Sequence, residues 1–472
     1  MRNLRWWDYI TVNVYWLGLN IASGSLTPYI LPLLVVLVVG EESKNTALGG
    51  LRAASMAVAI LVQAAAGLLS DRSTLRWGRR RPFIVVGTLL DLVFLALIGL
   101  AGIQWGNYWL LVAAVMLLQV SSNTAHGALQ GLIPDVVPEQ HRGKASGLKA
   151  AFELLPIILV GLTIARYVKA NTWGAILTVM GALLLGMIFT LPVHEEPLRE
   201  PVKEPVGPPL WRAAALTLIF VLVTALFGGL VGFVGKTLEG AGTLQLVGVA
   251  AAGLIAMAGS IILGVYWSAR VGIGAGARAH GSYVWWVINR LLFLAAVGSV
   301  QGFAQYFLGD VMKLPDAAAA TGNLMLVVGV STLITALISG FLADRVGRRV
   351  LVGGAGVVAG LGTFVLVASP NMTVVLISGC LIGAAAGTFL TSNWALGTDL
   401  VPKAEAGRYL GVSNLAGAGA GIVGAGLGGP MADFFNRASP GLGYLVIFGI
   451  YGACFLLSAV TLVKVPEALK RA

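Results

Sequence analysis

Three ionisable side chains lie deep inside apolar segments of the chain, where such groups can move protons or bind charged solutes. Asp91, Glu153 and Arg290 each lie about nine residues from one end of their segment, about 13 Å deep at 1.5 Å per helical residue. Burial favours the neutral form of a carboxyl group, so Glu153 is the preferred proton-coupling acid and Asp91 the second candidate. Lys149 stands one turn before Glu153 and could instead hold it ionised. Arg290 could pair with an anionic substrate or with Glu153.

A polar stripe runs along one further segment. Gln119, Asn123, His126 and Gln130 recur at i, i+4, i+7 and i+11, which places them on one face of a helix. Such a stripe faces either a water-filled cavity or another helix, so hydrogen bonding between helices without any substrate is the alternative. His126 could relay protons or be a satisfied structural histidine.

The composition places these residues in a membrane protein. Of the 472 residues, 57% are hydrophobic and 11% are charged, and the mean hydropathy is +0.88, unlike any water-soluble domain. A helix needs roughly 20 apolar residues to cross a bilayer, and fourteen segments supply them. The predicted spans lie near residues 12–39, 48–70, 83–102, 108–133, 144–166, 172–191, 212–235, 243–267, 283–308, 320–343, 350–369, 373–398, 409–429 and 442–463.

A polar, proline-rich linker, His194 to Pro209, divides these spans. We expect an all-α membrane protein. Its predicted parts are an N-terminal six-helix bundle over residues 1–191, a cytoplasmic linker over 192–211, an inserted transmembrane hairpin and loop over 212–281, and a C-terminal six-helix bundle over 282–472.

Basic residues collect in the loops at one end of the spans, which is the cytoplasmic end by the positive-inside rule. Both termini are therefore expected in the cytoplasm, with the protein multi-pass in the plasma (inner) membrane. The net charge of +11 follows from this bias and indicates no nucleic acid. The two cysteines, Cys380 and Cys454, lie in apolar runs, so neither a disulfide, a metal site nor a cofactor is expected.

An internal repeat relates the two bundles. Asp135 to Gly147 (DVVPEQHRGKASG) aligns without gaps on Asp399 to Gly411 (DLVPKAEAGRYLG). After the second span of each bundle, GLLSDR at 67–72 matches GFLADR at 340–345, and each is followed by Gly-Arg-Arg. Both pairs run in parallel, so the hairpin is expected to be an addition to a plan of two six-helix repeats.

The loop motif G-x-L-x-D-R-x-G-R-R resembles that of the major facilitator superfamily of transporters. Its first copy, SDRSTLRWGRRRPFI at 70–84, resembles the form in sucrose/proton symporters and related glycoside carriers. The fourth span, with Asn123 and Thr124 through Gly127, is also similar to theirs, except that Gln119 stands where the sucrose carriers have an acid. The resemblance implies alternating access and a monomer.

This resemblance also implies that the first and fourth spans of each repeat line a central cavity. Asn13 and Asn20 lie seven residues apart on the first span. Arg290, Gln301 and Gln305 share a face of the corresponding span in the second bundle. The expected substrate-binding residues are Asn13, Asn20, Gln119, Asn123, His126, Arg290, Gln301, Gln305, Asn393 and Trp394.

The charged loops suggest a gate. An aspartate at a helix end that faces several arginines can latch two helices together on the cytoplasmic side, although the arginines could be topology signals only. Asp135 is expected to pair with Arg142, and Asp399 with Arg408. The expected gating residues are Asp71, Arg72, Arg76, Arg79, Arg80, Arg81, Asp135, Arg142, Asp344, Arg345, Arg348, Arg349, Asp399 and Arg408.

The pattern favours a secondary active transporter that imports a small-molecule sugar or glycoside with a coupling cation, a proton or sodium. Two alternatives stay open, namely proton-coupled export of a drug or metabolite, and a non-transporting membrane factor that binds a partner. An enzyme is not expected, because no cluster of nucleophile, base and orienting group is evident.

Overall fold

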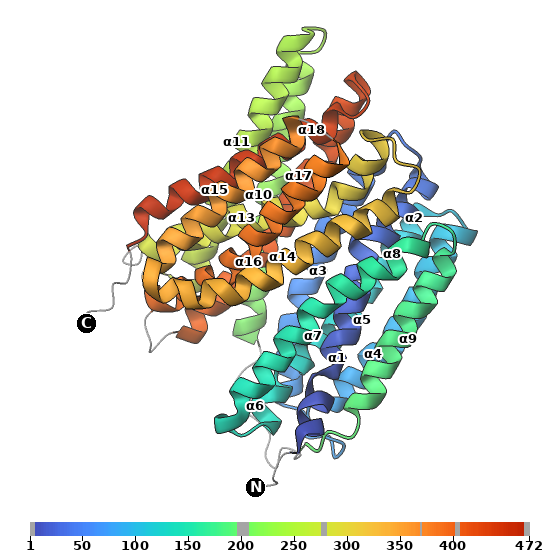
Figure 1. Cartoon of the computed structure of the whole chain (residues 1–472), viewed down its shortest axis with the longest axis vertical. Coiled ribbons are helices and arrows are strands. Elements are labelled where there is room, and N and C mark those ends of the chain that lie inside the picture. The colour runs from blue at the N-terminus through green and yellow to red at the C-terminus, as the bar shows by residue number, and fades with distance from the viewer. Residues whose placement is uncertain (1–4, 196–206, 275–280, 369–370, 402–405, 467–472) are drawn as a thin grey trace. The chain divides into compact units, whose positions relative to one another are not determined.

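The computed structural model describes residues 5–195, 207–274, 281–368, 371–401 and 406–466, and the chain there folds into long helices joined by short turns (Figure 1). A few side chains inside these ranges, including those of Asp344 and Arg408, lie outside the described part. In hydrocarbon every backbone N–H and C=O needs an internal partner, and a helix supplies one for nearly all of them.

Fourteen helical segments of the described chain are long and apolar enough to cross a membrane, which confirms the predicted number. The first six contain α1 (Trp6–Ser25) continued by α2 (Leu31–Val39), α3 (Lys44–Asp71), α4 (Arg81–Gly99), α5 (Tyr108–Gln130) with the short α6 (Leu132–Val136), α7 (Arg142–Leu162) with α8 (Ile164–Tyr167), and α9 (Thr172–Thr190). The other eight are α10 (Gly207–Thr237), α11 (Thr243–Ile273), α13 (Gly281–Asp310), α14 (Ala317–Val346), α15 (Arg348–Ala368), α16 (Met372–Leu400), α17 (Ala406–Ala438) and α18 (Leu442–Thr461).

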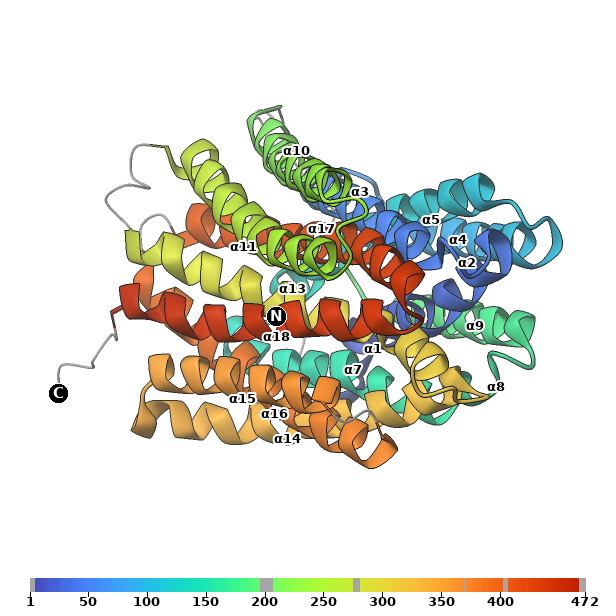
Figure 2. The ribbon, with the colours of Figure 1, turned by 90° about the horizontal axis from the view of Figure 1, so that it is seen from above.

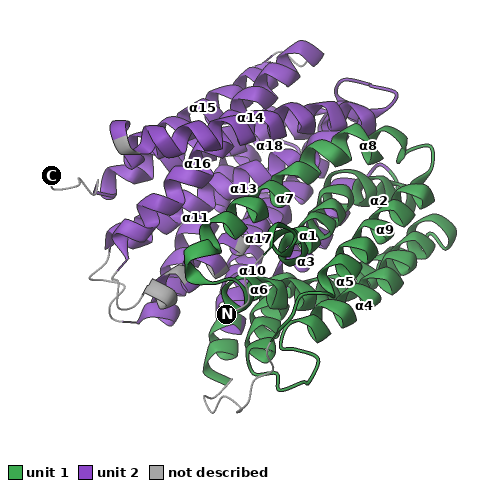
Figure 3. Ribbon diagram, turned by 60° about the horizontal axis from the view of Figure 1, so that its bottom comes forward, with its two compact units in different colours: residues 1–40, 58–213 green, residues 41–57, 214–472 purple. Residues whose placement is uncertain are grey.

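The chain divides into two compact units (Figure 3). Unit 1 comprises residues 1–40 and 58–213, and unit 2 comprises residues 41–57 and 214–472. The hairpin of α10 and α11 falls almost entirely in unit 2, where α11 packs against α17 (Figure 2). The domain boundaries drawn from the sequence, and the status of the hairpin as an insertion, stay predictions.

Side-chain caps close several helices at the ends predicted to be extracellular. Asn107 accepts a hydrogen bond from the N–H of Leu110 at the start of α5, and Asn371 accepts one from Val374 at the start of α16. Such a cap satisfies an otherwise unpaired backbone donor and contributes about 1 kcal/mol. Because α5 and α16 are the fourth spans of the two repeats, the internal symmetry extends to their caps.

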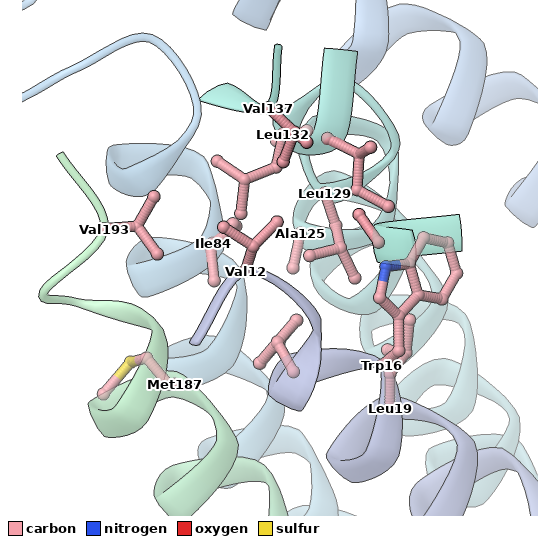
Figure 4. Packing of buried hydrophobic residues seen from close by; sticks show 14 residues of the cluster. Val12, Trp16, Leu19, Ile84, Ala125, Leu129, Leu132, Val137, Met187 and Val193 are labelled. Carbon is pink, nitrogen blue, oxygen red and sulfur yellow. The ribbon is translucent and has the colours of Figure 1, made fainter. Parts of the chain in front are cut away.

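A hydrophobic cluster in unit 1 joins the helices that carry the candidate site (Figure 4). Val12, Trp16 and Leu19 of α1 meet Ala125 and Leu129 of α5 in this cluster. Dispersion contacts and small residues must hold helices together in lipid, where the hydrophobic effect between helices is weak. The cluster therefore fixes the face of α1 that is turned towards α5.

The beginning of α3 is anchored inside unit 2. Asp433 of α17 is only 2% exposed, and its carboxylate accepts hydrogen bonds from the Asn45 amide side chain at 2.8 Å and the Thr46 N–H at 2.7 Å. Lys44 forms ion pairs with Glu41 at 2.5 Å and with Asp310 of α13 at 2.7 Å. A carboxylate at a helix amino end satisfies free N–H groups and opposes the helix dipole.

Close packing of α1 on α9 generates a test of the fold. A Cβ at Gly18 would lie 2.8 Å from the Ala182 carbonyl oxygen of α9, whereas a Cβ at Gly24, also in α1, would meet nothing within 4 Å. We expect Gly18→Ala to lower the free energy of unfolding by about 1–3 kcal/mol, because α9 must move. Gly24→Ala should be neutral or stabilising by about 0.5–1 kcal/mol, because alanine favours the helix.

Thermal unfolding of the two purified variants in detergent measures the difference. An equal shift of both unfolding temperatures would contradict the packing of α1 on α9.

Candidate functional site

Arg80, at the start of α4, links three helices at the end of unit 1 that is predicted to be cytoplasmic. It is 4% exposed. Its Nε donates to Asp135 of α6 at 2.8 Å, its Nη1 donates to Ser70 of α3 at 2.6 Å, and its Nη2 pairs with Asp71 at the end of α3. Asp135 also binds Arg79 Nη2 at 2.5 Å. The predicted arrangement of aspartates facing arginines is therefore present in unit 1.

The charges around Arg80 keep it protonated. Burial by itself would lower the pKa of Arg80, but the hydrogen bonds and negative charges of Asp135 and Asp71 outweigh it and raise this pKa above its ordinary value. The guanidinium group thus serves as a permanent positive charge in the cluster.

A third acid, Glu195, completes the cluster and was missed in the sequence because it belongs to the linker. Its carboxylate accepts hydrogen bonds from the backbone N–H of Arg80 at 2.7 Å and of Arg81 at 3.1 Å. Gly78 lies directly against it with a φ of +114°, and a Cβ there would come within 2.8 Å of Glu195 Oε2. The glycine of the repeated loop motif is thus required both by its backbone conformation and by the close approach of Glu195.

Unit 2 repeats the ion pair. Arg348 Nη1 binds Asp399 Oδ2 at 2.5 Å and the Ala395 carbonyl oxygen at 3.0 Å. In the aligned repeats Arg348 corresponds to Arg79, and Asp399 to Asp135. The two ion pairs therefore occupy equivalent positions in the two repeats, and their N···O distances are equal.

The predicted pairing of Asp135 with Arg142 was wrong. Arg142 donates instead to the backbone carbonyl oxygens of Pro134 at 3.0 Å and Val137 at 3.2 Å, and Asp135 is taken by Arg79 and Arg80. The corresponding pairing of Asp399 with Arg408, and any role of Asp344, fall on side chains outside the described part.

The remaining arginines of the predicted gate differ in their surroundings. Arg81 donates to the Leu191 carbonyl oxygen at 3.1 Å, and Arg72 has a buried Nη1 with no hydrogen-bond partner among the described residues. Arg76 and Arg345 are exposed, and Arg349 is half-buried. Among the arginines of the predicted gate, ion pairs are found for Arg79, Arg80, Arg81 and Arg348.

A chain of aromatic and charged groups joins α1, α5 and α7 in unit 1. Lys149 Nζ lies 4.1 Å from the ring centre of Trp16 and 3.4 Å from Glu153 Oε1. The His126 ring meets Trp16 edge to face at 5.2 Å, and Gln130 lies 3.4 Å from His126. Cation–π and ion-pair contacts of this kind hold Lys149 in place. Of these five residues the sequence predicted His126 and Glu153 as site residues, Gln130 as part of the polar stripe and Lys149 as the alternative partner of Glu153. It missed Trp16, which an aromatic residue at helical spacing between Asn13 and Asn20 could have signalled.

Asparagine and glutamine residues nearby bind mostly to their own helices. Asn20 donates to the Trp16 carbonyl oxygen at 2.8 Å, and Asn123 donates to Gln119 Oε1 at 3.0 Å. Asn13 is the exception, because its side chain bridges from α1 to the Ala145 carbonyl oxygen of α7 at 3.1 Å. The hydrogen bonds found for the polar stripe of α5 thus join residues of α5 to one another.

Asp91 lies apart from this group. It is fully buried between α4 and α5, where Ser121 Oγ donates to its carboxyl group. A group in this position supports the packing of two helices. Glu153, in contrast, has 36% of its side chain exposed.

Arg290 occupies an aromatic and amide cradle in unit 2. Its guanidinium carbon lies 5.2 Å from the ring centre of Trp394 and 5.9 Å from that of Trp286, and its Nη1 donates to Asn393 Oδ1 at 3.2 Å. Asn393 is itself held by Asn289 at 2.8 Å. The structure brings together Arg290, Asn393 and Trp394, as predicted, and adds Trp286 and Asn289, which apolar neighbours hid in the sequence.

The other predicted residues of α13 lie further along it. Gln301 is half-buried and Gln305 is buried. Near them lies Arg52 of α3, which the sequence analysis overlooked and which donates from Nη2 to the Gly298 carbonyl oxygen at 3.0 Å. The missing Cβ of Gly302 leaves the space for its guanidinium group. Arg290 and Arg52 thus both lie away from the ends of their helices in unit 2.

Comparison with known proteins decides the family. The family model described as Major Facilitator Superfamily matches residues 14–309 and 291–472, which is nearly the whole chain. The chain belongs to the Major Facilitator Superfamily. The resemblance carried by the repeated loop motif is thereby confirmed, as is a multi-pass membrane protein.

Curated relatives of this superfamily member include proteins named for polyol and sugar transport. The chain is 29% identical over 112 residues to the minor myo-inositol transporter IolF of Bacillus subtilis, a match that covers 24% of this chain and 26% of the relative. It is 29% identical over 118 residues to the sucrose transport protein SUT1 of Oryza sativa subsp. japonica, with 21% of this chain and 22% of the relative covered. The matches thus span about a quarter of the relatives' length.

Solved structures of the superfamily share the fold over almost the full length. The nucleoside transporter NupG superposes with a TM-score of 0.66 at 12% identity, covering 97% of this chain and 98% of that one. The inward open xylose transporter XylE from E. coli gives 0.65 at 17% identity, with 98% and 97% covered. At these identities the likeness concerns the fold alone.

The two related ion pairs of this superfamily member should differ in their contribution to stability. Asp135→Asn leaves the buried Arg80 with less compensation and should lower the free energy of unfolding by about 3 kcal/mol or more. Asp399→Asn should cost about 1 kcal/mol or less, because the side chains of Arg348 and Asp399 are 27% and 31% exposed. Thermal unfolding in detergent compares the two, and an equal or larger loss in Asp399→Asn would contradict this ranking.

Proposed function

We propose that this chain is a secondary active transporter that moves a sugar or glycoside by alternating access, coupled to a cation and in the first place to protons. One observation carries the proposal. In each unit, the first and the fourth span of the repeat bring aromatic and polar side chains into contact, namely Trp16 and His126 in unit 1 and Arg290 and Trp394 in unit 2. Sites for small polar solutes combine aromatic surface with a few polar groups in this way.

The relatives support the solute class. Those named for myo-inositol and sucrose match this chain over a limited stretch, so the substrate is a proposal that rests on both the matched segments and the two cradles. The candidate solute-binding residues remain those predicted from the sequence. The buried Trp16, Trp286 and Asn289 hold His126 and Asn393 in position.

Glu153 is the proposed proton-coupling residue. In contrast to the buried Asp91, it is partly exposed although it lies well inside its helix, and Lys149 pairs with it. Protonation of Glu153 would end this ion pair and leave Lys149 held only by the face of Trp16. Since Trp16 also contacts His126, a change at Glu153 would be passed through Lys149 and Trp16 to His126.

The ion pairs at the loop ends are the proposed gate. Arg79 and Arg80 with Asp135, and Arg348 with Asp399, would form and break as the transporter alternates. The positive-inside rule supports a cytoplasmic location for these loops and for both termini. A plasma-membrane location and a monomeric state belong to the same proposal.

Uptake into proteoliposomes tests the transport proposal. With the purified chain and an inward proton gradient, we expect accumulation of at least one member of a panel of labelled monosaccharides, disaccharides and myo-inositol. Absence of uptake under both proton and sodium gradients would refute it. Outward-directed transport of an apolar drug instead would identify an exporter.

A neutral side chain at position 153 should uncouple the transporter. Glu153→Gln should abolish accumulation driven by the proton gradient while retaining solute exchange at equal concentrations, because the amide cannot take up or release a proton. Glu139→Gln, an exposed acid of the neighbouring turn, is the matched control and should behave like the wild type. Proton-driven accumulation by Glu153→Gln at the wild-type rate would exclude Glu153 as the coupling acid.

A further inference from the structure

Arg290 carries a charge that unit 2 does not neutralise in its described part. Its only described hydrogen bond is to the neutral amide of Asn393, and its Nε is buried without a partner among the described residues. It lies about nine residues from the start of α13, about 13 Å into the span. A cation at that depth is costly unless a counter-charge or water compensates it.

The described carboxylates of unit 2 lie near the ends of helices or in turns. Asp399 near the end of α16 pairs with Arg348, Asp310 at the end of α13 pairs with Lys44, and Asp433 near the end of α17 binds the start of α3. The others are Glu41, Glu42, Glu239 and Asp316. None of these seven forms an ion pair with Arg290, so its counter-charge has to come from outside the described part of unit 2.

Glu153 of unit 1 is the alternative partner inside the chain, but it already has a cation. Lys149 stands one helical turn away and binds it at 3.4 Å. Unit 1 thus holds a balanced pair within its spans, whereas unit 2 holds Arg290 and also Arg52, whose Nε and Nη1 are buried without described partners. The excess of positive charge lies in unit 2.

The cradle holds Arg290 ready to bind an anion. Trp286 is fixed by its Nε1, which donates to the Asn393 carbonyl oxygen at 3.0 Å, and Asn289 donates to the Ser458 carbonyl oxygen at 2.8 Å. Trp394 is 37% exposed, so part of its ring is not covered by the rest of the chain. The guanidinium group is thus positioned before any ligand arrives, which reduces the entropic cost of binding.

We propose that the transported solute is a sugar that carries one carboxylate, and that Arg290 binds this carboxylate. This inference rests on the proposed transport of a sugar and adds that the sugar carries one negative charge. One guanidinium group balances one negative charge, so a uronate fits better than a sugar phosphate, whose second charge would stay uncompensated in an apolar surrounding. Trp394, which is 37% exposed, offers a flat surface on which a sugar ring can pack, and the buried Trp286 supports Arg290.

Competition in proteoliposomes tests the charge of the solute. The full chain is offered D-glucose against D-glucuronate, D-galactose against D-galacturonate, and D-glucose 6-phosphate. We expect the wild type to take up or bind at least one uronate about tenfold or more in preference to its neutral parent, and to reject the phosphate. Arg290→Gln should lose this preference by about tenfold or more, because a charge-assisted hydrogen bond is lost, and Arg290→Lys should keep part of it.

Arg270 provides the matched control. It also lies over two aromatic rings, Tyr266 at 5.9 Å and Trp267 at 5.7 Å, but it is exposed near the end of α11. Arg270→Gln should keep the wild-type preference for uronates. The unfolding temperatures of all variants are compared, and the preference of the wild type decides the question even if Arg290→Gln fails to fold.

The outcomes separate this inference from the proposed function. Uptake of neutral sugars in preference to uronates would overturn the inference and leave sugar transport intact. If Arg290→Gln and Glu153→Gln each abolish uptake and the double variant recovers it, Arg290 pairs with Glu153 and the inference is wrong. Failure of every sugar, neutral or charged, would refute the proposed function as well.

Discussion

The cost of an unsatisfied polar group in hydrocarbon is the constraint on which this structure depends. It makes every spanning segment helical, and it moves helix caps such as Asn107 and Asn371 to the ends of the spans. Inside the spans it favours polar side chains that find partners in the same or a neighbouring helix, as Asn289 and Asn393 do. Arg290 is one of several groups with a buried atom that has no partner among the described residues, and it is one that carries a charge.

The same constraint explains how much could be predicted from the sequence. Hydropathy defined the number of spans, and the repeated loop motif led to the family and to the arginine–aspartate clusters. The partners of individual side chains were harder to predict, because several residue types can form a hydrogen bond or ion pair with one aspartate. Arg142 was the nearest cation in the sequence to Asp135, but Arg79 and Arg80 reach it through the fold. Glu195 was missed because a linker acid gives no periodic signal, and Trp16 because its role depends on which face of α1 meets α5.

Charge is distributed unequally between two units that are built on the same repeat. Unit 1 places a lysine and a glutamate together within its spans, which suits a site that takes up and releases a proton. Unit 2 places arginines among neutral amides and indole rings, which suits recognition of a solute. The two six-helix repeats thus differ in the chemistry of their polar groups. The loops have stayed similar, because the ion pairs Arg79–Asp135 and Arg348–Asp399 occupy equivalent positions.

The anchoring of α3 also has a consequence for how the protein is made. Asn45 and the carboxylate that caps it, Asp433, are 388 residues apart in the chain. Since chains enter the membrane from the amino end, the second span is inserted long before its cap exists, and its first N–H groups must rely on water at the membrane surface until α17 has been synthesised. The start of α3 therefore obtains its hydrogen-bond partner only after α17, the last but one of the long helices, has been synthesised.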